Sequence, residues 1–397
     1  MDAYPLFADR TPNVCGANCL RPARCDRMGD VASDFSADFA LLDVPRDTPP
    51  TDADAYLRAA IAWHFGADTG STFWLQAAKG LDFDPLTDVR TFADLRLFPN
   101  LVDELRSVPV EDLIPRGYGS PLPIPRIYES GGTTGAPKRT AQLPDWVEQV
   151  TRWQVEDFTA GGFVGGRGLL CMMPSGPHGV GHFDREVAER LGSTFHPIDL
   201  DPRWVKKLAA RDATAEVAAY VDHVVEQARF ILETQSVANL HATPPLLEAI
   251  ARDDALVDLV NEKIRYMLLS GAHVNMDTLD VLRAVFPHTA VATVFGSTMI
   301  LSQAATRIAG DGSFVFDPRS PYVVFWVIDP ETGEQVAYGD RGQVVMNHVS
   351  KGMFIPNNLE RDTAIRTPGP AGHVGDSVSE VAPVAVFGGE PVIEGVY

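Results

Sequence analysis

The 397-residue sequence predicts an α/β fold, and three observations carry this prediction. Short apolar runs alternate with helical segments from about residue 125 to 300, which is typical of a mainly parallel sheet covered by helices on both faces. From residue 311 onward, β-prone runs separated by turns such as "DPETGE" predict an antiparallel sheet or small barrel. A hydrophobic content of 45% and a charged content of 22% are ordinary for a globular core.

The chain divides into three parts on composition and periodicity. Residues 1–50 are rich in Pro, Asp and Arg without a sustained period, so we expect an irregular arm there. Residues 51–310 form the expected α/β core, and residues 311–397 the β-rich part. A chain of this length corresponds to about two to three units.

The expected elements follow from apolar spacing and from Gly and Pro punctuation. Helical periodicity or a glycine stop predicts helices at 53–66, 145–162, 186–192, 202–234, 244–260 and 275–286, and a helix pair at 91–109 broken at Pro99. Short apolar runs predict strands at 124–129, 168–174, 193–200, 237–243, 264–269 and 290–298.

The formal net charge is −20, which argues against nucleic acid and anionic membranes as partners, because both reward clustered Lys and Arg. The N-terminus has no cationic start followed by an apolar run, so we expect no secretory signal. No stretch approaches the roughly eighteen apolar residues of a membrane-spanning helix. We therefore expect a cytoplasmic protein.

Cysteine is scarce, which suits a reducing compartment better than a disulfide framework. Three of the four cysteines, Cys15, Cys19 and Cys25, cluster near the N-terminus, and the fourth is Cys171. The cluster could be a metal or redox site, but it lacks the close C-x-x-C pairs of a structural zinc site. A mobile arm with unpaired thiols is the favoured interpretation.

The stretch "SGGTTGAPK", residues 130–138, follows a predicted strand and contains the parts of a phosphate cradle. Glycines allow successive N–H groups to converge on oxygens, hydroxyls can donate to phosphate, and Lys138 adds a cation. The spacing from Gly135 to Lys138 excludes a Walker loop, which needs G-K-[ST] opening a helix. A plain glycine-rich turn is the alternative.

This stretch resembles the phosphate-loop signature S-G-[ST]-T-G-x-P-K of the adenylate-forming superfamily, which comprises acyl-CoA synthetases, peptide-synthetase adenylation domains and luciferases. Companion segments follow in the family's order, among them "PSGPHGVGH", "NLHATPPLLEAI", "LLSGAHVN", "VFGSTMI" and a run ending in "LERD". The resemblance covers about residues 90–385. It looks most like the phenylacetate-CoA ligase branch, and in particular the short lidless members of phenazine antibiotic biosynthesis.

The resemblance implies a fold and a set of site residues. The fold would be the family's large N-terminal domain, with two α/β subdomains of mainly parallel sheets and a small β subdomain. The ATP-binding residues would be Ser130, Gly131, Thr133, Thr134, Gly135, Lys138, Ser270, Gly271, Ala272, Phe295, Gly296, Ser297, Thr298 and Asp362, with Asp376 as a fallback for the ribose. His178, Gly179, His182, His241 and Ala242 would line the substrate pocket, and Thr134, Lys138 and His178 would be catalytic.

Two departures from the family pattern bear on catalysis. Met299 stands where the family has a glutamate that helps hold Mg²⁺, and a thioether is a poor ligand for this hard ion. Glu129 is a candidate replacement. The sequence also ends near the hinge, so we expect the mobile C-terminal lid with its catalytic lysine to be missing. Lys138 and Lys351 are the cations near the motifs that could partly compensate.

The implied function is ATP-dependent activation of a carboxylic acid, expected to be aromatic, to an acyl-adenylate in natural-product biosynthesis. The cofactors would be ATP and Mg²⁺, and the acyl group would pass to a reductase, a carrier protein or another acyl-accepting enzyme. No G-x-S-x-G nucleophile elbow is present, so no nucleophile is nominated from the histidines. Two alternatives stay open: a non-catalytic protein that binds a nucleotide or aromatic acid, and a ligase that joins the activated acid directly to a small amine.

Overall fold

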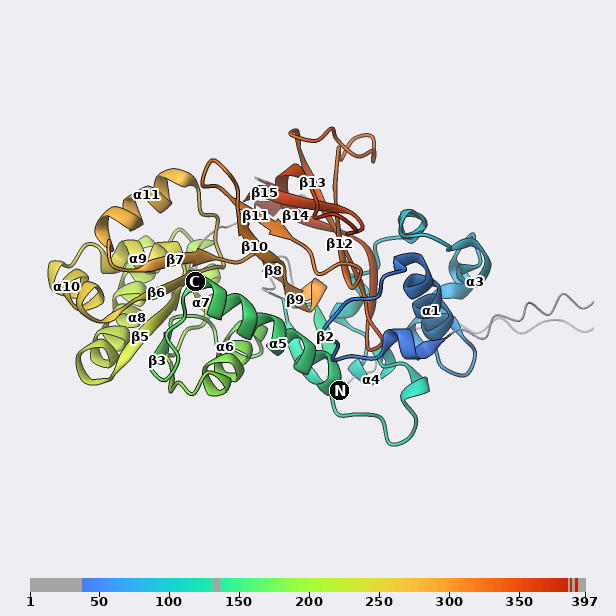
Figure 1. Cartoon of the computed structure of the whole chain (residues 1–397), viewed down its shortest axis with the longest axis horizontal. Coiled ribbons are helices and arrows are strands. Elements are labelled where there is room, and N and C mark those ends of the chain that lie inside the picture. Colours follow the sequence, from blue (N-terminus) through green and yellow to red (C-terminus); the bar gives the residue numbers. More distant parts are fainter. Residues whose placement is uncertain (1–37, 131–135, 385, 388–389, 392–397) are drawn as a thin grey trace, which may run out of the picture. The chain divides into compact units, whose positions relative to one another are not determined.

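The computed structural model describes residues 38–130, 136–384, 386–387 and 390–391. Figure 1 follows these residues from a helical N-terminal region in blue, through a parallel sheet with its helices in green and yellow, to an antiparallel sheet in red. The clustered Cys15, Cys19 and Cys25 lie outside the described residues, as does most of the expected N-terminal arm.

The N-terminal region consists of short helices around one longer helix. Its elements are α1 (Ala53–Phe65), α2 (Thr72–Ala77), α3 (Pro85–Asp88) and α4 (Val110–Leu113), with 3₁₀ turns η1 (Phe39–Leu42), η2 (Ala78–Gly80), η3 (Phe92–Leu97), η4 (Glu104–Arg106) and η5 (Arg116–Tyr118). The helix pair expected at 91–109 is corrected to the 3₁₀ turns η3 and η4. η3 has six residues and η4 three, and Pro99 and Pro109 prevent either segment from continuing as a longer helix.

Five parallel strands form the central sheet, in the order β4-β3-β5-β6-β7, as the alternating pattern predicts. The strands are β3 (Gly168–Cys171), β4 (Phe195–Pro197), β5 (Val237–Ala242), β6 (Tyr266–Leu269) and β7 (Ala290–Thr293). The accompanying helices are α5 (Pro144–Gly161), α6 (Gly179–Arg190), α7 (Pro202–Ala209), α8 (Thr214–Thr234), α9 (Pro244–Ile250), α10 (Asp254–Lys263) and α11 (Met276–Val285), and they flank the sheet in Figure 1. Every residue of β3, β5 and β6 is buried.

One parallel sheet is present among the described residues, where the resemblance implied two. The N-terminal part of the chain supplies helices and 3₁₀ turns instead of strands. The physical reason is visible in the sequence, since residues 51–125 contain frequent prolines and helical caps but no β-branched runs. This part of the expected fold is therefore corrected.

An antiparallel hairpin leads into the parallel sheet. It pairs β1 (Arg126–Glu129) with β2 (Arg139–Gln142), and these strands flank the glycine-rich stretch. At the base of the hairpin, the Ser130 N–H donates to the Lys138 carbonyl at 2.9 Å, and the Lys138 N–H donates to Ser130 Oγ at 3.1 Å. These bonds fix both ends of the stretch.

The β-rich part forms a six-stranded antiparallel sheet in the order β10-β11-β15-β12-β13-β14, as expected. β15 also pairs with β14, so the four strands β15, β12, β13 and β14 form a small closed ring. The strands are β10 (Ala305–Ile308), β11 (Phe314–Asp317), β12 (Val323–Ile328), β13 (Arg341–Val349), β14 (Phe354–Pro368) and β15 (Asp376–Pro383). The short pairs β8 (Gly296–Ser297) with β9 (Ser302–Gln303), and β16 (Val386–Phe387) with β17 (Glu390–Pro391), lie outside this sheet.

Helix α1 is joined to the end of β13 by three side-chain hydrogen bonds. Tyr56 Oη donates to the carbonyl of Val349 at 2.8 Å, and Trp63 Nε1 to that of Lys351 at 2.9 Å. His64 Nε2 lies 2.8 Å from the carbonyl of Ser350. The helix therefore satisfies three successive carbonyls where the strand leaves its ladder, which is a requirement for buried backbone groups.

A buried asparagine fixes the loop that enters the parallel sheet. Asn239 of β5 is fully buried, and its Oδ1 accepts from the Val164 N–H at 2.8 Å. Its Nδ2 lies within 3.3 Å of the carbonyls of Val164, Arg167 and Gly168. Asn239 thus replaces the hydrogen bonds that this loop cannot make as a strand.

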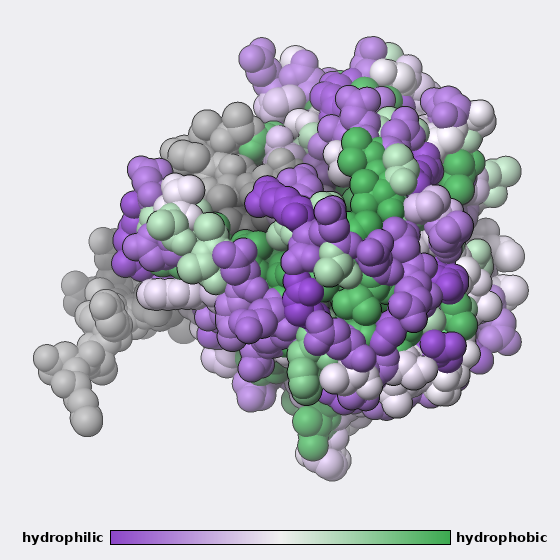
Figure 2. Space-filling model, turned by 90° about the vertical axis from the view of Figure 1, so that its left-hand side faces the viewer, coloured by the Kyte–Doolittle hydropathy of each residue, from purple (hydrophilic) through white to green (hydrophobic). Residues whose placement is uncertain are grey.

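One face of the molecule is mainly polar. The face in Figure 2, which is the left-hand side of Figure 1, is mainly hydrophilic with hydrophobic side chains interspersed. Within the described ranges, no helix combines the length and the apolarity needed to cross a bilayer.

Candidate active site

A cavity of about 720 Å³ lies at the carboxyl ends of the parallel strands, where the antiparallel sheet meets them. His241 of β5, Ser270 after β6 and Thr293 of β7 line one part of it, and Asp362 of β14 and Val381 of β15 line another. Ligands of open α/β sheets bind outside the carboxyl ends of the strands. The topology therefore favours this cavity as the binding site.

The residues expected after β6 and β7 to contact the base and the α-phosphate gather in this cavity. Ser270, Gly271 and Ala272 form the turn after β6, and Phe295 to Thr298 follow β7. Gly271 has φ +79°, a conformation that favours glycine. The Phe295 ring is held by Phe316 and Phe325, whose centroids lie 5.7 and 5.8 Å away.

The two aspartates nominated for the ribose have different positions. Asp362 lies in β14 and lines the cavity. Asp376 is 2% exposed, accepts from Arg366 Nε at 2.9 Å and Gln335 Nε2 at 3.0 Å, and is not among the described residues that line the cavity. The geometry thus favours Asp362, and Asp376 serves the packing of the β sheet.

The five residues nominated for the substrate pocket divide in the same way. His178, Gly179 and His241 line the cavity, whereas His182 and Ala242 are not among its described lining residues. His182 lies one turn into α6, and its Nε2 is 3.6 Å from Glu186. Burial, with the nearby charges of Arg203 and Lys206, lowers the pKa of His178 to about 4, so this side chain is a neutral hydrogen-bonding group at pH 7.

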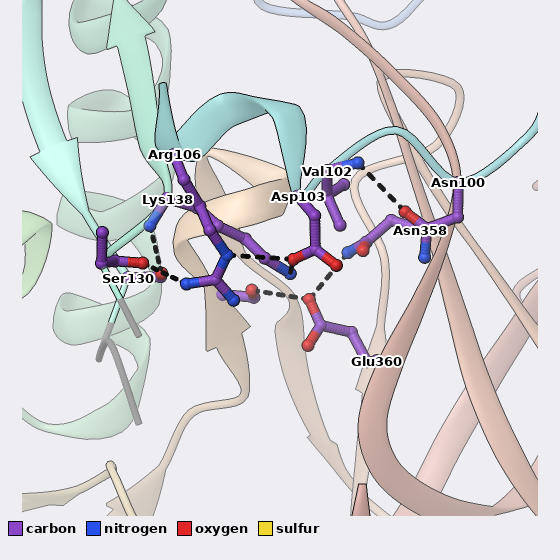
Figure 3. A network of polar contacts seen from close by, with 10 residues as sticks. Asn100, Val102, Asp103, Arg106, Ser130, Lys138, Asn358 and Glu360 are labelled. Atoms are coloured by element: carbon purple, nitrogen blue, oxygen red, sulfur yellow. Dashed lines mark hydrogen bonds and ion pairs between the residues drawn. The ribbon is translucent and has the colours of Figure 1, made fainter. Parts of the chain in front are cut away.

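The cation of the glycine-rich stretch, Lys138, lies at the described C-terminal end of the stretch. Gly131, Thr133, Thr134 and Gly135 lie outside the described residues. Lys138 Nζ lies 3.5 Å from Asp103 Oδ1, and Arg106 Nε lies 3.1 Å from the same oxygen (Figure 3). Arg106 also donates to the carbonyl of Ala136, so η4 brings a second cation to the end of the stretch.

Glu129 is occupied by two arginines in this structure. Its Oε1 accepts from Arg139 Nε at 2.9 Å, and its other oxygen is paired with Arg203 of α7. Partial burial raises the pKa of Glu129, but the hydrogen bonds from Arg203 and Arg139 outweigh this effect and hold the pKa below its usual range. Glu129 lines the cavity, and its role as a metal ligand stays a prediction.

Met299 is buried, and a different acid lies beside its motif. Its side chain belongs to the core formed with the N-terminal helices. Glu360 of β14 accepts from Ser297 Oγ at 3.1 Å and from Asn358 Nδ2 at 2.8 Å (Figure 3). No group of three or more His, Cys, Asp or Glu side chains in the described part of the chain is arranged to hold a metal by itself.

Lys351 and Cys171 are not among the described residues that line the cavity. Lys351 Nζ is 2.6 Å from Asp43 Oδ1 and 4.9 Å from the centre of the Trp63 ring. Cys171 ends β3, and its Sγ donates to Asp184 Oδ2 at 3.1 Å. Burial and the charge of Asp184 raise the pKa of the Cys171 thiol, so it remains protonated.

Sequence reasoning missed two acids and a cation at this site. Asp184 lies on the buried face of α6, Glu360 lies beside Ser297, and Arg106 lies at the end of the glycine-rich stretch. A signal for Asp184 was available: it is spaced three and four residues from Val187 and Ala188, so an acid occupies an apolar helical stripe. Glu360 and Arg106 had no comparable signal.

Comparison with solved structures identifies the fold. The chain is similar to a 2-hydroxyisobutyryl-CoA ligase in the postadenylation state in complex with R3-HIB-AMP, with a TM-score of 0.55 and 14% identity over 83% of this chain and 65% of the ligase. The chain therefore shares the fold of the part of this ligase that it matches. The same ligase with 2-HIB-AMP and CoA, in the thioesterification state, matches with a TM-score of 0.53, 13% identity and coverage of 83% and 67%.

The likeness is to part of the ligase. The chain spans about 65% of the length of the ligase that it matches. ATP-bound MatB from Rhodopseudomonas palustris matches with a TM-score of 0.43 and 18% identity over 67% of this chain and 50% of MatB. A scan against protein-family models found no match, and a search of curated proteins found none at a significant level.

Proposed function

We propose that this protein activates a carboxylic acid with ATP to form an acyl-adenylate. One observation carries the proposal: Ser270, Phe295, Thr298 and Asp362, nominated from sequence alone, line a single cavity. The fold supports it, because the similar ligase was crystallised in a postadenylation state with an adenylate. A carboxylate is a poor electrophile, and joining it to AMP supplies a good leaving group.

Each residue has a physical task in this proposal. Phe295 offers a ring face to adenine, and the Asp362 carboxylate suits two vicinal ribose hydroxyls. Lys138 and Arg106 supply positive charge where the phosphates would lie, which stabilises the charge of the displacement. The work of the site is alignment of the carboxylate and α-phosphate more than acid–base chemistry.

The carboxylate near the motif of Met299 fits a Mg²⁺ ion whose other ligands are mainly phosphate oxygens of the nucleotide. This ion uses one or two carboxylates together with phosphate oxygens and waters, so a complete protein cage is not required. Glu360 is not among the described residues that line the cavity, but it lies at the cavity's edge, because its carboxylate accepts from Ser297, which lines it. In our proposal Glu360 takes the place of the family's glutamate, and the metal would neutralise phosphate charge when bound.

The lining of the cavity favours an aromatic acid. Tyr128 and Phe183 line it beside His178, and their ring centroids are 6.0 Å apart. Such a wall suits a flat apolar ring, and neutral His178 can hydrogen-bond a ring substituent. We propose a role in natural-product biosynthesis, in which a reductase, carrier protein or other acyl-accepting enzyme takes the acyl group.

An ATP–pyrophosphate exchange assay with a panel of aromatic and aliphatic acids tests the proposal. We expect exchange that requires one class of acid and Mg²⁺, and that is at least about 100-fold weaker in Asp362→Ala. Asp340→Ala, an exposed change outside the cavity, is the matched control and should leave exchange unchanged.

Other outcomes would select the alternatives. Measurable binding of ATP or acid without exchange for any acid would contradict the enzyme and favour a non-catalytic binding protein. Exchange followed by amine-dependent release of AMP would favour direct ligation to a small amine.

A further inference from the structure

A serine, a histidine and an aspartate form a hydrogen-bonded chain at the wall of the cavity. His241 Nε2 lies 2.7 Å from Ser270 Oγ, and His241 Nδ1 lies 2.7 Å from Asp184 Oδ2. All three residues line the cavity, and the side chains of His241 and Asp184 are 2% and 3% exposed. They come from β5, the turn after β6 and α6, so only the folded chain brings them together.

The hydrogen-bond directions follow from the chemistry of the groups. A carboxylate oxygen accepts a hydrogen bond, so His241 Nδ1 donates to Asp184, and in this tautomer Nε2 is left as an acceptor. Ser270 can then donate its hydroxyl proton to Nε2. The competing acceptor, Met173 Sδ, lies 4.0 Å from Ser270 Oγ and is a weak one.

Asp184 has a second contact at the same oxygen. The protonated Cys171 thiol donates to the oxygen that faces His241 Nδ1, so groups from two neighbouring strands fix the position of this carboxylate. This is the arrangement of a nucleophile, a general base and an orienting acid, which is recognised by geometry and roles rather than by chain position. The absence of a G-x-S-x-G elbow therefore does not exclude it.

We propose that Ser270 is a nucleophile that accepts the acyl group, with His241 as general base and Asp184 as the positioning residue. The acyl donor rests on the proposed function: it is the acyl-adenylate formed in the same cavity. No residue was nominated as a nucleophile from the sequence, and the resemblance gave Ser270 only an adenine contact.

The proposed step balances in atoms and charge. Ser270 Oγ bonds to the acyl carbon, the bond from that carbon to the phosphate oxygen breaks, and AMP leaves with the electron pair. The hydroxyl proton passes through His241 to the departing AMP. In the second half, water or an amine gives its proton to His241 and attacks the acyl carbon, and Ser270 regains its proton as the ester breaks.

Labelling with an alkyl fluorophosphonate probe tests the nucleophile without ATP or acid. We expect covalent modification of Ser270 in the full chain, located by peptide mass spectrometry and absent in Ser270→Ala. His241→Gln should label at least about 100-fold more slowly, because the base is removed. Ser236→Ala is the matched control, since Ser236 is exposed and is not among the described residues that line the cavity; its labelling should equal that of the original protein.

The positioning role of Asp184 needs a separate readout. Asp184→Asn should reduce the maximal labelling rate at least about 100-fold, while the probe concentration at half-maximal rate stays the same, since Asp184 does not touch the probe. Rates are expressed per folded molecule, measured by circular dichroism. An unchanged maximal rate in Asp184→Asn would overturn this role.

The outcomes separate the nucleophile from the adenylation. Pyrophosphate exchange without an adduct on Ser270 in folded protein overturns the nucleophile and leaves adenylation standing. An adduct without exchange for any acid leaves the nucleophile standing and overturns adenylation as the source of the acyl group. Equal labelling of the original protein and His241→Gln also overturns the proposal.

Discussion

At the residue scale, the burial of Met299 excludes the metal-binding acid that the resemblance implies at this position. The side chain is 4% exposed and packs with the N-terminal helices, so it is part of the core. A glutamate there would have to bury a carboxylate among apolar groups. The acid that lies beside Ser297 comes instead from another strand, at Glu360.

We predict that Met299→Glu destabilises the protein and does not raise exchange activity. Burying an unpaired carboxylate should cost more than about 3 kcal/mol of the free energy of unfolding. Urea unfolding measures this loss, and Met299→Leu should lose less than about 1.5 kcal/mol because it conserves volume and polarity. A stable Met299→Glu protein with increased exchange would contradict the prediction.

Two lysines offer a matched comparison of charge at the site. Lys138→Ala removes the cation at the end of the glycine-rich stretch, and we expect pyrophosphate exchange to fall about 100- to 1,000-fold. Both lysines have an acidic partner, Asp103 for Lys138 and Asp43 for Lys351, so their position distinguishes them. Lys351→Ala should leave exchange unchanged, because its ammonium lies over Trp63 of α1 and not at the end of the glycine-rich stretch. Comparable losses in both variants would show that net charge, not position, determines the rate.

At the element scale, the attachment of α1 to β13 creates two buried histidines. His64 of α1 contacts the carbonyl of Ser350, and His348 of β13 contacts the carbonyl of Ile300 at 2.9 Å. Burial lowers the pKa of His64 to about 4 and that of His348 to about 3. The hydrogen bonds to carbonyls oppose this effect without cancelling it.

We predict that acid destabilises this attachment. An unfolded histidine takes up its proton near pH 6.5, whereas His64 in the folded protein does not until about pH 4. The unfolded state therefore binds more protons in this window, so stability is full above pH 6.5 and falls as the pH drops toward 4. For His64 alone the loss is about 3 kcal/mol.

Urea unfolding at pH 7.5 and 4.5 measures this loss. His64→Gln keeps a donor for the Ser350 carbonyl but cannot titrate, so its stability should depend less on pH. An identical pH dependence in the two proteins would contradict the assignment to His64.

The elements show where sequence reasoning succeeds. The turns after β6 and β7 were predictable because short apolar runs followed by Gly or Ser define strand ends, and strand ends meet at one edge of a parallel sheet. His182 did not reach the cavity because α6 begins at Gly179, so His178 is extended and His182 is on another helical face. Packing determines which face of a helix turns toward its sheet, and the same packing turns Asp184 of α6 inward.

At the scale of the whole molecule, the cavity depends on two separately built sheets. Ser270 follows a strand of the parallel sheet, whereas Asp362 belongs to the antiparallel sheet. The sequence could indicate each sheet, but not the distance between the two sheets. That distance depends on packing between residues far apart in the chain, which no local pattern encodes. Glu360 was missed for the same reason.

A ligand that contacts both sheets should stabilise the whole molecule. We predict that a sulfamoyl-adenosine analogue of the acyl-adenylate, made from the acid most active in exchange, adds about 2.7 kcal/mol at 100 times its dissociation constant. Thermal unfolding at increasing concentrations measures the effect. Asp362→Ala should weaken it, and an absent shift at saturation would contradict binding across the sheets.

Asn239 gives the cavity a dependence on a distant loop. It lies two residues before His241 on β5, so both side chains project from the same face of the strand. Asn239 opposes Leu169, and His241 opposes Cys171. The hydrogen bonds between Asn239 and the 164–168 loop therefore also fix the register of β3 against β5 where His241 lies. Loosening this loop would shift the imidazole against its serine and aspartate together, and reactivity could be tuned from a point that never meets substrate.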